Sequence, residues 1–509
     1  MTLPDWLGPL YAGEEMRAVD SWAIESQGVP GTDLMERAGQ ALARSAARIA
    51  GPGPVRVVVG RGNNGGDGLV AARLLRGEGR EVDVLAAEPL GDLRGDAAAN
   101  LERLPGESPR LLDSASLQGS GVVVDAILGT GFSGAPRGPA AAAIGVVNEA
   151  AGGPVLACDL PSGVDAATGE VAGLAVAAAH TVTFHGEKVG LRVAPGAFRA
   201  GTVEVAPIGV PRGAPLPTRV GLVTAAALAA VPRRAADGSK FNSGTVVIAG
   251  GAAGMTGAPL MAALAAMRSG AGYVQLAVPA GIRQVLELRL MEAMTRGLPE
   301  HDGGHVEEGS AELVRMAGRA GAVVLGPGLG RTPGAIAFAR RATVSLACPL
   351  VLDADGLNAH ADAIEGIRER SGATVLTPHA AELGRLLERS PEDVGAHRLA
   401  CVTEAAERSG AVVLLKGHDT LVAAPGGPVA VNSSGSPALA TAGTGDVLAG
   451  VIGALLAGGL DPFRAACAAA YVHGLAGRLA GLRVGDDHTV AGDVIEALPG
   501  AFSRARRPD

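Results

Sequence analysis

Oxygen-bearing side chains follow three short apolar runs in the first third of the chain. The runs are residues 55–59, 122–127 and 155–158, and each has the length of a buried strand. Because the carboxyl ends of parallel strands meet at one edge of a sheet, we expect the polar side chains to border a single crevice. They are Asn63, Asn64 and Asp67 after the first run, Asp125 within the second, and Asp159 and Ser162 after the third.

The chemistry of this group indicates a cation site. Amide, carboxylate and hydroxyl oxygens, with no Cys or His among them, suit a hard alkali or alkaline-earth ion. Asp125 or Asp159 taken alone could equally cap a turn. Together with Asn64, the two aspartates favour a binding site.

The stretch 60–68, Gly-Arg-Gly-Asn-Asn-Gly-Gly-Asp-Gly, begins with the pattern G-x-G-x-x-G. Between a strand and a helix this pattern is typical of a dinucleotide site, in which an acidic residue about 20 positions later binds ribose. A purely structural turn is the alternative. Asp67 argues against simple pyrophosphate binding, because a carboxylate in the first helical turn repels phosphate. The loop therefore suits a hydroxylated or amide-bearing ligand, or a cation.

A second glycine-rich stretch, residues 441–448, reads Thr-Ala-Gly-Thr-Gly-Asp-Val-Leu and precedes an Ala-rich segment. Glycines before a helix form an anion hole from backbone N–H groups. Asp446 cannot help to bind phosphate there by charge, but it can accept the proton of a hydroxyl group that attacks phosphorus. A simple helix N-cap is the alternative role for Asp446.

Three further polar turns are expected to converge on Asp446, because each follows an apolar run. They are Gly326–Gly330, Thr377–Glu382 and Lys416–Thr420. His379 taken alone is more often structural, and Glu382 is a candidate helper for a water molecule or Mg²⁺.

The elements that must position these residues are short β-branched runs alternating with Ala-rich helical stretches. This alternation predicts an α/β architecture with parallel sheets covered on both faces. Residues 12–48 are predicted to be helical, and prolines cluster at residues 207–217. For a chain of 509 residues we therefore predict two tandem α/β domains, 1–215 and 216–509.

The composition argues against several classes of protein. A net charge of −8 and an aromatic content of 2% do not suit nucleic-acid binding. The four cysteines are widely spaced, which predicts free thiols rather than a disulfide framework or a zinc site. No signal peptide and no apolar run of membrane-spanning length are apparent, so a cytoplasmic protein is expected.

Five motifs of the first domain together resemble the NAD(P)H-hydrate epimerase family. They are Leu34–Gly39, Gly62–Gly68, Asp125 with Gly129–Gly131, Asp159–Gly163 and Lys188–Leu191. The resemblance covers about residues 12–210 and implies a Rossmann-like parallel sheet.

This resemblance implies that the first domain binds hydrated NAD(P)H and a K⁺ ion. It implies a catalytic Asp159 that contacts the substrate, and Lys188 as a basic residue near the site; an exposed surface lysine is the alternative. The K⁺ ligands would be Asn64, Asp125 and Ser162. The substrate-binding residues would be Asn63, Asn64, Gly65, Gly66, Asp67, Gly129, Thr130, Gly131, Phe132, Ser133, Gly134 and Ala135.

The second half resembles the ribokinase-like superfamily and, within it, the ADP- or ATP-dependent NAD(P)H-hydrate dehydratases. The supporting residues are Met255–Leu260, Arg268–Gly272, Gly326–Gly330, Thr377–His379, Lys416–Gly417 and Gly443–Asp446. One segment departs from the family pattern: residues 239–244 read Ser-Lys-Phe-Asn-Ser-Gly where the family often has His-Lys-Gly. The role of that segment stays open.

The second resemblance implies phosphoryl transfer to the ring hydroxyl with Asp446 as the base, in a site that uses Mg²⁺. Ala258, Gly330, His379 and Asp446 would line the hydrated nucleotide. Lys416, Gly417, His418, Asp419, Thr420 and Gly445 would hold ADP or ATP.

The two resemblances together predict a bifunctional repair enzyme that acts on small molecules and forms a homo-oligomer. One rival hypothesis is a vitamin or sugar kinase fused to a regulatory domain. The other treats the first domain as a binding module without catalytic activity.

Overall fold

The computed structural model describes residues 3–215, 218–234 and 243–506. The chain divides into two compact units. The first unit is Pro9–Val220, and the second unit consists of Leu3–Gly8 together with the chain from Gly221 onward. Residue 216, where the second domain was predicted to begin, and residues 239–242 of the departing segment lie outside the described residues.

The first unit contains a seven-stranded sheet in the order β4-β3-β2-β5-β6-β7-β8. All of its neighbouring strands are parallel. The strands are β2 (Val55–Val59), β3 (Val82–Ala86), β4 (Arg110–Leu111), β5 (Val122–Ala126), β6 (Val155–Cys158), β7 (His180–Phe184) and β8 (Thr202–Ala206). The chain reverses its direction across the sheet between β2 and β5, which makes their carboxyl ends the expected ligand position.

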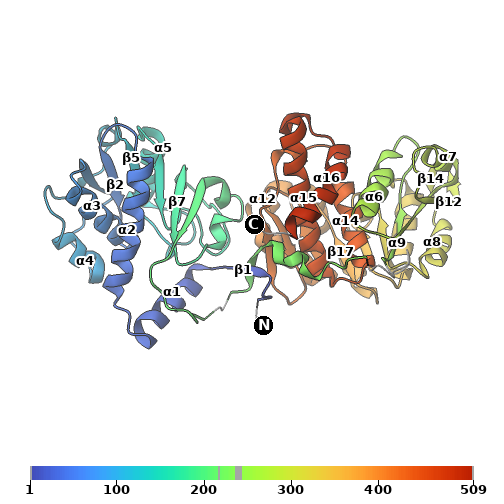
Figure 1. The fold of residues 1–509 in the computed structure, drawn as a ribbon, viewed down its shortest axis with the longest axis horizontal. Helices are drawn as coiled ribbons and strands as arrows, with labels where there is room; N and C mark the ends of the chain where they lie inside the picture. The colour runs from blue at the N-terminus through green and yellow to red at the C-terminus, as the bar shows by residue number, and fades with distance from the viewer. Residues whose placement is uncertain (1–2, 216–217, 235–242, 507–509) are drawn as a thin grey trace. The chain divides into compact units, whose positions relative to one another are not determined.

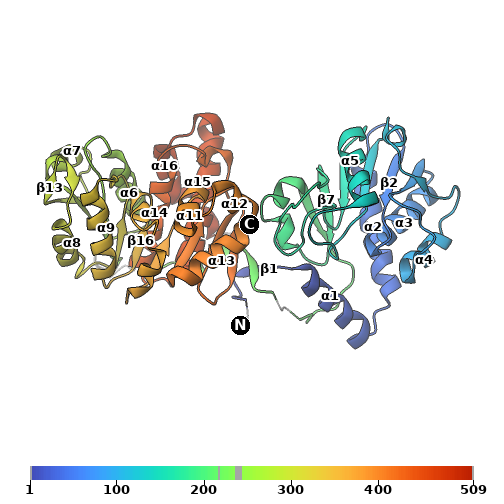
Figure 2. The same cartoon turned by 180° about the vertical axis from the view of Figure 1, so that it is seen from behind.

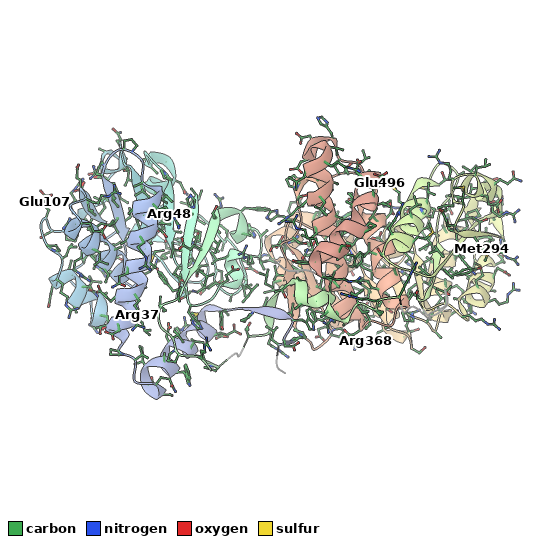
Figure 3. All side chains as sticks on the ribbon, in the orientation of Figure 1. Arg37, Arg48, Glu107, Met294, Arg368 and Glu496 are labelled. Atoms are coloured by element: carbon green, nitrogen blue, oxygen red, sulfur yellow. The ribbon has the colours of Figure 1, made fainter. Side chains whose placement is uncertain are left out.

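Helices cover both faces of this sheet. Apolar residues of α2 and α3 pack with Val57 and Val124 on one face, and those of α5 pack with Val58 and Val123 on the other. Figure 3 labels Arg48 near the end of α2, where its guanidinium pairs with Glu204 of β8. The helices are α1 (Gly13–Ser21), α2 (Gly31–Ile49), α3 (Asn63–Gly77), α4 (Gly95–Glu102) and α5 (Gly138–Ala150).

The segment predicted to be helical over residues 12–48 forms two α-helices. A short π-helical turn, Trp22–Ser26, continues α1, and the chain then leaves the helical conformation before α2. Gly28 has a φ of 70° and Pro30 precedes the first residue of α2. A left-handed glycine and a proline at this spacing end one helix and allow the next to begin.

The second unit contains an eleven-stranded sheet in the order β1-β9-β20-β19-β18-β17-β16-β15-β10-β11-β12. The strands from β18 to β12, at one end of this order, are parallel, and β18, β19 and β20 pair antiparallel. The strands are β1 (Leu7–Leu10), β9 (Val220–Val223), β10 (Thr245–Ala249), β11 (Tyr273–Pro279), β12 (Met294–Leu298), β15 (Ala322–Leu325), β16 (Leu350–Leu352), β17 (Thr374–Leu376), β18 (Val412–Leu415), β19 (Thr420–Ala423) and β20 (Val429–Asn432).

Four long helices pack on one face of the second sheet, and Figure 1 shows them in front of it. They are α6 (Gly257–Arg268), α14 (Thr444–Ala457), α15 (Pro462–Val484) and α16 (Ala491–Ala505). Figure 2 shows the opposite face, covered by α9 (Pro333–Ser345), α11 (Ala380–Leu387) and α13 (Arg398–Ser409). The remaining elements are α7 (Arg283–Glu287), β13 (Glu300–His301), β14 (Gly304–His305), α8 (Gly309–Ala317), α10 (Asp355–Asn358) and α12 (Pro391–Ala396).

Helices therefore cover both faces of the sheet in each unit, as predicted. The first sheet is parallel throughout, whereas the second also contains the antiparallel strands β19 and β20. The four cysteines are free thiols. Among the described residues, no helix has the length and hydropathy that a membrane crossing needs.

Candidate active sites

A cavity of about 620 Å³ opens at the carboxyl end of the first sheet. It lies at the reversal between β2 and β5. Of the residues predicted to bind substrate, the lining includes Asn63, Asn64, Asp67, Gly129, Thr130, Gly131 and Phe132. Gly65 and Gly66 instead pack inward, and Ser133, Gly134 and Ala135 are not part of the lining.

Three predicted cation ligands lie together beneath this cavity. The Ser162 hydroxyl donates to Asp125 Oδ1 over 2.6 Å, and the Ser162 N–H donates to Asp125 Oδ2 over 2.8 Å. Asn64 Nδ2 donates to the Leu128 carbonyl over 2.8 Å, and the same carbonyl lies 3.2 Å from the Ser162 hydroxyl. Side chains from three neighbouring strand ends are thus brought to one point.

This cluster fits a hard monovalent cation. Asp125 is fully buried, and no Lys or Arg of the described residues pairs with it. Burial raises the pKa of Asp125 to about 6, against the lowering by its hydrogen bonds from Ser162 and Ile127. Because Asn64 donates through Nδ2, its Oδ1 stays available as a ligand. A cation beside these oxygens would balance a carboxylate charge that burial otherwise penalises.

Asp159 lies at the end of β6 and is held by three donors. Lys188 Nζ lies 2.5 Å from Asp159 Oδ1, and the Thr183 hydroxyl donates to the same oxygen over 2.9 Å. The Phe184 N–H also donates to it, over 3.3 Å. Lys188 is only 1% exposed, so the alternative of a surface lysine is wrong. The φ of Asp159 is 66°, an unusual conformation for a residue with a side chain, and Asp159 lines the cavity.

A close backbone approach explains one of two glycines at the junction of β2 and α3. A Cβ added at Gly65 would lie 2.1 Å from the Gly60 carbonyl oxygen, so the turn closes only without a side chain. A Cβ added at Gly62 would meet no atom within 4 Å. Gly65 is therefore needed for the shape of the turn, whereas Gly62 is not.

Two further carboxylates face the Asp159–Lys188 pair. Asp67, predicted from the glycine-rich loop, has a pKa well above its usual value because of burial and the negative charges of Asp159 and Asp20. Asp20 of α1 also lines the cavity, and burial raises its pKa to about 6. The sequence analysis missed Asp20, because it lies inside a helix with no motif around it.

The second candidate site is built around Lys416, at the end of β18. Its Nζ lies 3.0 Å from Asp353 Oδ1 and 3.7 Å from Glu382 Oε2. Thr377 donates its hydroxyl to the same oxygen of Asp353 over 2.7 Å. Asp353 follows β16 directly and was missed by the sequence analysis, although its place after an apolar run is the signal that identified Asp159.

Asp446 lies in the first turn of α14. Burial, together with the negative charges of Asp353 and Glu382, raises its pKa to about 7 against the lowering by Lys416. Gly443 precedes the helix with a φ of 90°. A Cβ added at Gly445 would lie 3.4 Å from Lys416 Nζ, so the glycine turn and the lysine are close neighbours. Gly443 is the N-cap residue of α14 and has no side chain that could cap the helix.

His379 has a structural role at the start of α11. Its Nδ1 accepts hydrogen bonds from the N–H groups of Ala381 and Glu382, and Glu382 Oε2 in turn accepts from the His379 N–H. This reciprocal capping arrangement stabilises the first turn of the helix. The imidazole is half exposed, and its Nε2 lies 3.5 Å from Glu382 Oε1.

A buried ion pair between Arg398 and Asp419 stabilises the Lys416–Thr420 turn. Arg398 of α13 donates through Nε to Asp419 Oδ2 over 3.2 Å and through Nη2 to the Asp419 carbonyl over 2.9 Å. A Cβ added at Gly417 would lie 2.4 Å from Arg398 Nη2. Asp419 therefore shapes the turn from its buried side.

The predicted residues Ala258 and Gly330 lie on neighbouring segments. A Cβ added at Gly328 would lie 3.1 Å from the Cβ of Ala258, and the Gly330 N–H donates to Asp355 Oδ2 over 3.0 Å. The loop Gly326–Gly330 thus bridges the start of α6 and the carboxylates that follow β16.

Comparisons with known proteins agree with this division of the chain. Residues 31–190 match the family model described as YjeF-related protein N-terminus, and residues 246–499 match the model described as NAD(P)H-hydrate dehydratase. The structure of the ADP/ATP-dependent NAD(P)H-hydrate dehydratase of Bacillus subtilis, co-crystallised with ATP and Mg²⁺, is 28% identical. It covers 56% of this chain and 98% of its own, with a TM-score of 0.48.

Curated relatives match over nearly their whole length. The bifunctional NAD(P)H-hydrate repair enzyme of Moorella thermoacetica is 40% identical, and the match covers 96% of both chains. The enzyme of the same name from Salinibacter ruber is 42% identical over 96% of this chain and 95% of its own. At this identity and coverage, the chain belongs to the family of bifunctional NAD(P)H-hydrate repair enzymes.

Proposed function

We propose that the first unit interconverts the R and S forms of hydrated NADH and NADPH, and that the second unit dehydrates the S form. The dehydration uses ADP or ATP and releases AMP or ADP together with phosphate. The observation that carries this proposal is a match of 40% identity that spans 96% of both this chain and its relative. A separate polar site in each unit supports the assignment of one reaction to each.

The chemistry of the first reaction suits the first cavity. Hydrated nicotinamide is a carbinolamine, a carbon that bears a hydroxyl group next to the ring nitrogen. Loss of the hydroxyl or opening of the ring, followed by closure on the other face, inverts that carbon. Asp159 moves the proton, and Lys188 and Thr183 hold its carboxylate in place. This reaction needs no redox cofactor.

A potassium ion at Asn64, Asp125 and Ser162 would order the loops that contact the substrate. No cluster of three or more His, Cys, Asp or Glu side chains suited to a metal ion occurs in the described part of the chain. The K⁺ proposal relies instead on amide, hydroxyl and carbonyl oxygens around the single carboxylate of Asp125.

We expect epimerisation to be faster in K⁺ than in Na⁺, and Asp125→Ala to weaken this preference. Epimerisation rates in buffers that differ only in the cation test this expectation. Thr168→Ala offers a control, because its hydroxyl serves a separate turn, at Glu170. Equal rates with K⁺ and in buffer without alkali ions would contradict it.

The second unit performs the dehydration through phosphoryl transfer. Asp446 accepts the proton of the ring hydroxyl as that oxygen attacks the terminal phosphate of ADP or ATP. Phosphate then leaves as the lone pair of the ring nitrogen forms a carbon–nitrogen double bond, and loss of a proton from the neighbouring ring carbon restores NAD(P)H. Lys416 provides a positive charge beside the glycine turn, where phosphate oxygens would accept from backbone N–H groups.

Several finer assignments belong to this proposal. The hydrated nucleotide contacts Ala258, Gly330, His379 and Asp446, and the phosphate donor lies on Lys416–Thr420 and Gly445. Mg²⁺ would bind together with the phosphates of the donor, and Glu382, 3.7 Å from Lys416 Nζ, is the carboxylate that would hold one of its water ligands. We further propose that the chain acts in the cytoplasm as a homo-oligomer.

The decisive experiment is to incubate the purified chain with hydrated NADH and either ADP or ATP. We expect the absorbance of reduced nicotinamide to return, with one phosphate released for each NADH. A stable phosphorylated product would instead support the rival vitamin or sugar kinase. Failure of the chain to convert R hydrate into S hydrate would support a first unit without catalytic activity.

A further inference from the structure

The N-terminal helix α1 contributes a carboxylate to the cavity of the first unit. Asp20 lines the cavity together with Asp67, Asp159 and Lys188. It comes from an element outside the segment 31–190 that matches the family model. The cavity is therefore completed by a part of the chain that precedes all of the strand-end loops.

The position of α1 against the cavity is fixed by a close backbone contact. A Cβ added at Gly13, the first residue of α1, would lie 2.2 Å from the Thr130 carbonyl oxygen. Tyr11 and Lys188 form an isolated β-bridge, in which the Tyr11 N–H donates to the Glu187 carbonyl over 2.8 Å. This bridge joins the residues just before α1 to the segment of the buried lysine. Helix α1 is thus held at both the Gly129–Gly131 loop and the Lys188 segment.

Asp20 differs from the other acidic residues that stabilise local structure. Glu15, on the same helix, accepts a hydrogen bond from the Ala12 N–H over 2.7 Å and so caps the helix. The carboxylate of Asp20 has no hydrogen-bond or ion-pair partner within residues 3–215, 218–234 and 243–506. A partly buried carboxylate that faces a cavity without a partner is free to act on a ligand.

The surroundings of Asp20 and Asp159 differ. Asp159 forms an ion pair with the buried ammonium group of Lys188, whereas no cation among the described residues pairs with Asp20. Burial and the negative charge of Asp159 raise the pKa of Asp20 to about 6, against the lowering by Lys188. Asp67 is the other carboxylate beside this pair. Two neighbouring carboxyl groups in different environments are the usual arrangement for one acid and one base.

We infer that Asp20 is a second catalytic acid–base residue of the first cavity and acts together with Asp159. This inference rests on the epimerisation proposed above and assigns a residue to its second proton transfer. Inversion by loss and return of water needs both an acid and a base at the same carbon.

The reaction balances with these two residues. The carbon–oxygen bond of the carbinolamine breaks, and the oxygen takes a proton from the Asp20 carboxyl group and leaves as water. The ring nitrogen supplies its lone pair to form a carbon–nitrogen double bond. A water molecule then adds to the other face of that carbon, returns the electron pair to nitrogen and gives a proton to Asp159. After the inversion Asp20 is ionised and Asp159 is protonated. The reverse reaction starts from these two protonation states.

Asp20→Asn in the full chain tests this inference, with Glu15→Gln as the control on the same helix. We expect Asp20→Asn to lower kcat for R-to-S conversion on the order of a hundredfold, with a small change in KM. Asp20→Glu, which keeps a carboxyl group, should retain far more of the rate. Dehydration of pure S hydrate should be unchanged in all three variants. Glu15→Gln should convert R to S at the rate of the unmodified chain.

The pH profile and an oxygen label separate catalysis from a structural role. A limb of the kcat profile near pH 6 should be present in the unmodified chain and absent in Asp20→Asn, in which Asp67, Asp159 and Lys188 are retained. In ¹⁸O-labelled water, the hydrate should gain one label for each inversion.

The outcomes that overturn the inference are distinct from those that overturn the function. A chain that does not interconvert the two hydrates at all contradicts the proposed function. A chain that interconverts them normally while Asp20→Asn stays within about threefold of its rate, or while Glu15→Gln loses as much, contradicts only the role of Asp20. Retention of the original oxygen through inversion would do the same.

Discussion

Asp446 combines a raised pKa with a place beside a glycine turn, and this combination supports its proposed role as a base. Asp446→Asn keeps the size of the side chain but cannot accept a proton. We expect dehydration of S hydrate to slow on the order of a hundredfold or more, with the fold retained. Asp461→Asn is the matched control, because Asp461 caps α15 through the Arg464 N–H and is exposed. Near-normal turnover by Asp446→Asn, measured from NADH absorbance, would favour a structural role.

The raised pKa of Asp446 also predicts how dehydration depends on pH. Only the ionised carboxylate can accept the hydroxyl proton, and burial and neighbouring carboxylates place its pKa at about 7. We therefore expect kcat/KM for S hydrate to rise from about pH 6 to about pH 8 and to level off above. A profile that is flat across this range would contradict the assignment. Asp461→Asn should show the profile of the unmodified chain.

At the level of single residues, the sequence predicts a site best where a carboxylate follows an apolar run. Asp159 was identified in this way, and Asp125 was identified as a carboxylate inside such a run. Asp353 gives the same signal after β16, a strand that the sequence also predicts, but it lies outside the motifs from which the second site was predicted. Asp20 could not be predicted, because its place in the cavity depends on how α1 packs against the loop after β5.

Among the elements, the turn between β2 and α3 allows a direct test of how the first site is built. In Gly65→Ala the new methyl group would overlap the Gly60 carbonyl, and overpacking of this kind costs about 1–3 kcal/mol. We expect the thermal unfolding of the first unit to shift to lower temperature and epimerisation to fall, with dehydration of S hydrate unchanged.

Gly62→Ala is the control for this element, because the added methyl group meets no atom within 4 Å. Differential scanning calorimetry of the two full-length variants gives the comparison. Equal unfolding temperatures for Gly65→Ala and the unmodified chain would show that the turn tolerates a side chain.

The parallel strands were predicted because each is a continuous apolar run between helical segments. The antiparallel strands β19 and β20 were not predicted, because a hairpin breaks the alternation of strands and helices on which the prediction was based. They are joined by residues 424–428, where Gly426 has a φ of 61°. Strands β1 and β9 meet at the edge of the second sheet although some 210 residues separate them, and no local pattern indicates such a pairing.

For the molecule as a whole, a fusion of the two activities has a chemical reason. A dehydratase that accepts only the S hydrate would leave the R hydrate unrepaired, and an epimerase in the same chain supplies the missing conversion. The two sites are built from different strands of different sheets. The proposal therefore requires that a substitution in one site leaves the reaction of the other site unchanged.

A mixed pool of R and S hydrates with excess ADP or ATP tests this independence. The unmodified chain should restore the whole pool to NAD(P)H. Asp446→Asn should restore almost none, while the two hydrates still interconvert. Asp159→Ala should show a fast phase that ends when the initial S hydrate is consumed, followed by the spontaneous rate of epimerisation. Asp159 lies in the first unit and Asp446 in the second. If Asp159→Ala lowers the rate constant of the fast phase itself, the two reactions are not divided between the units as proposed.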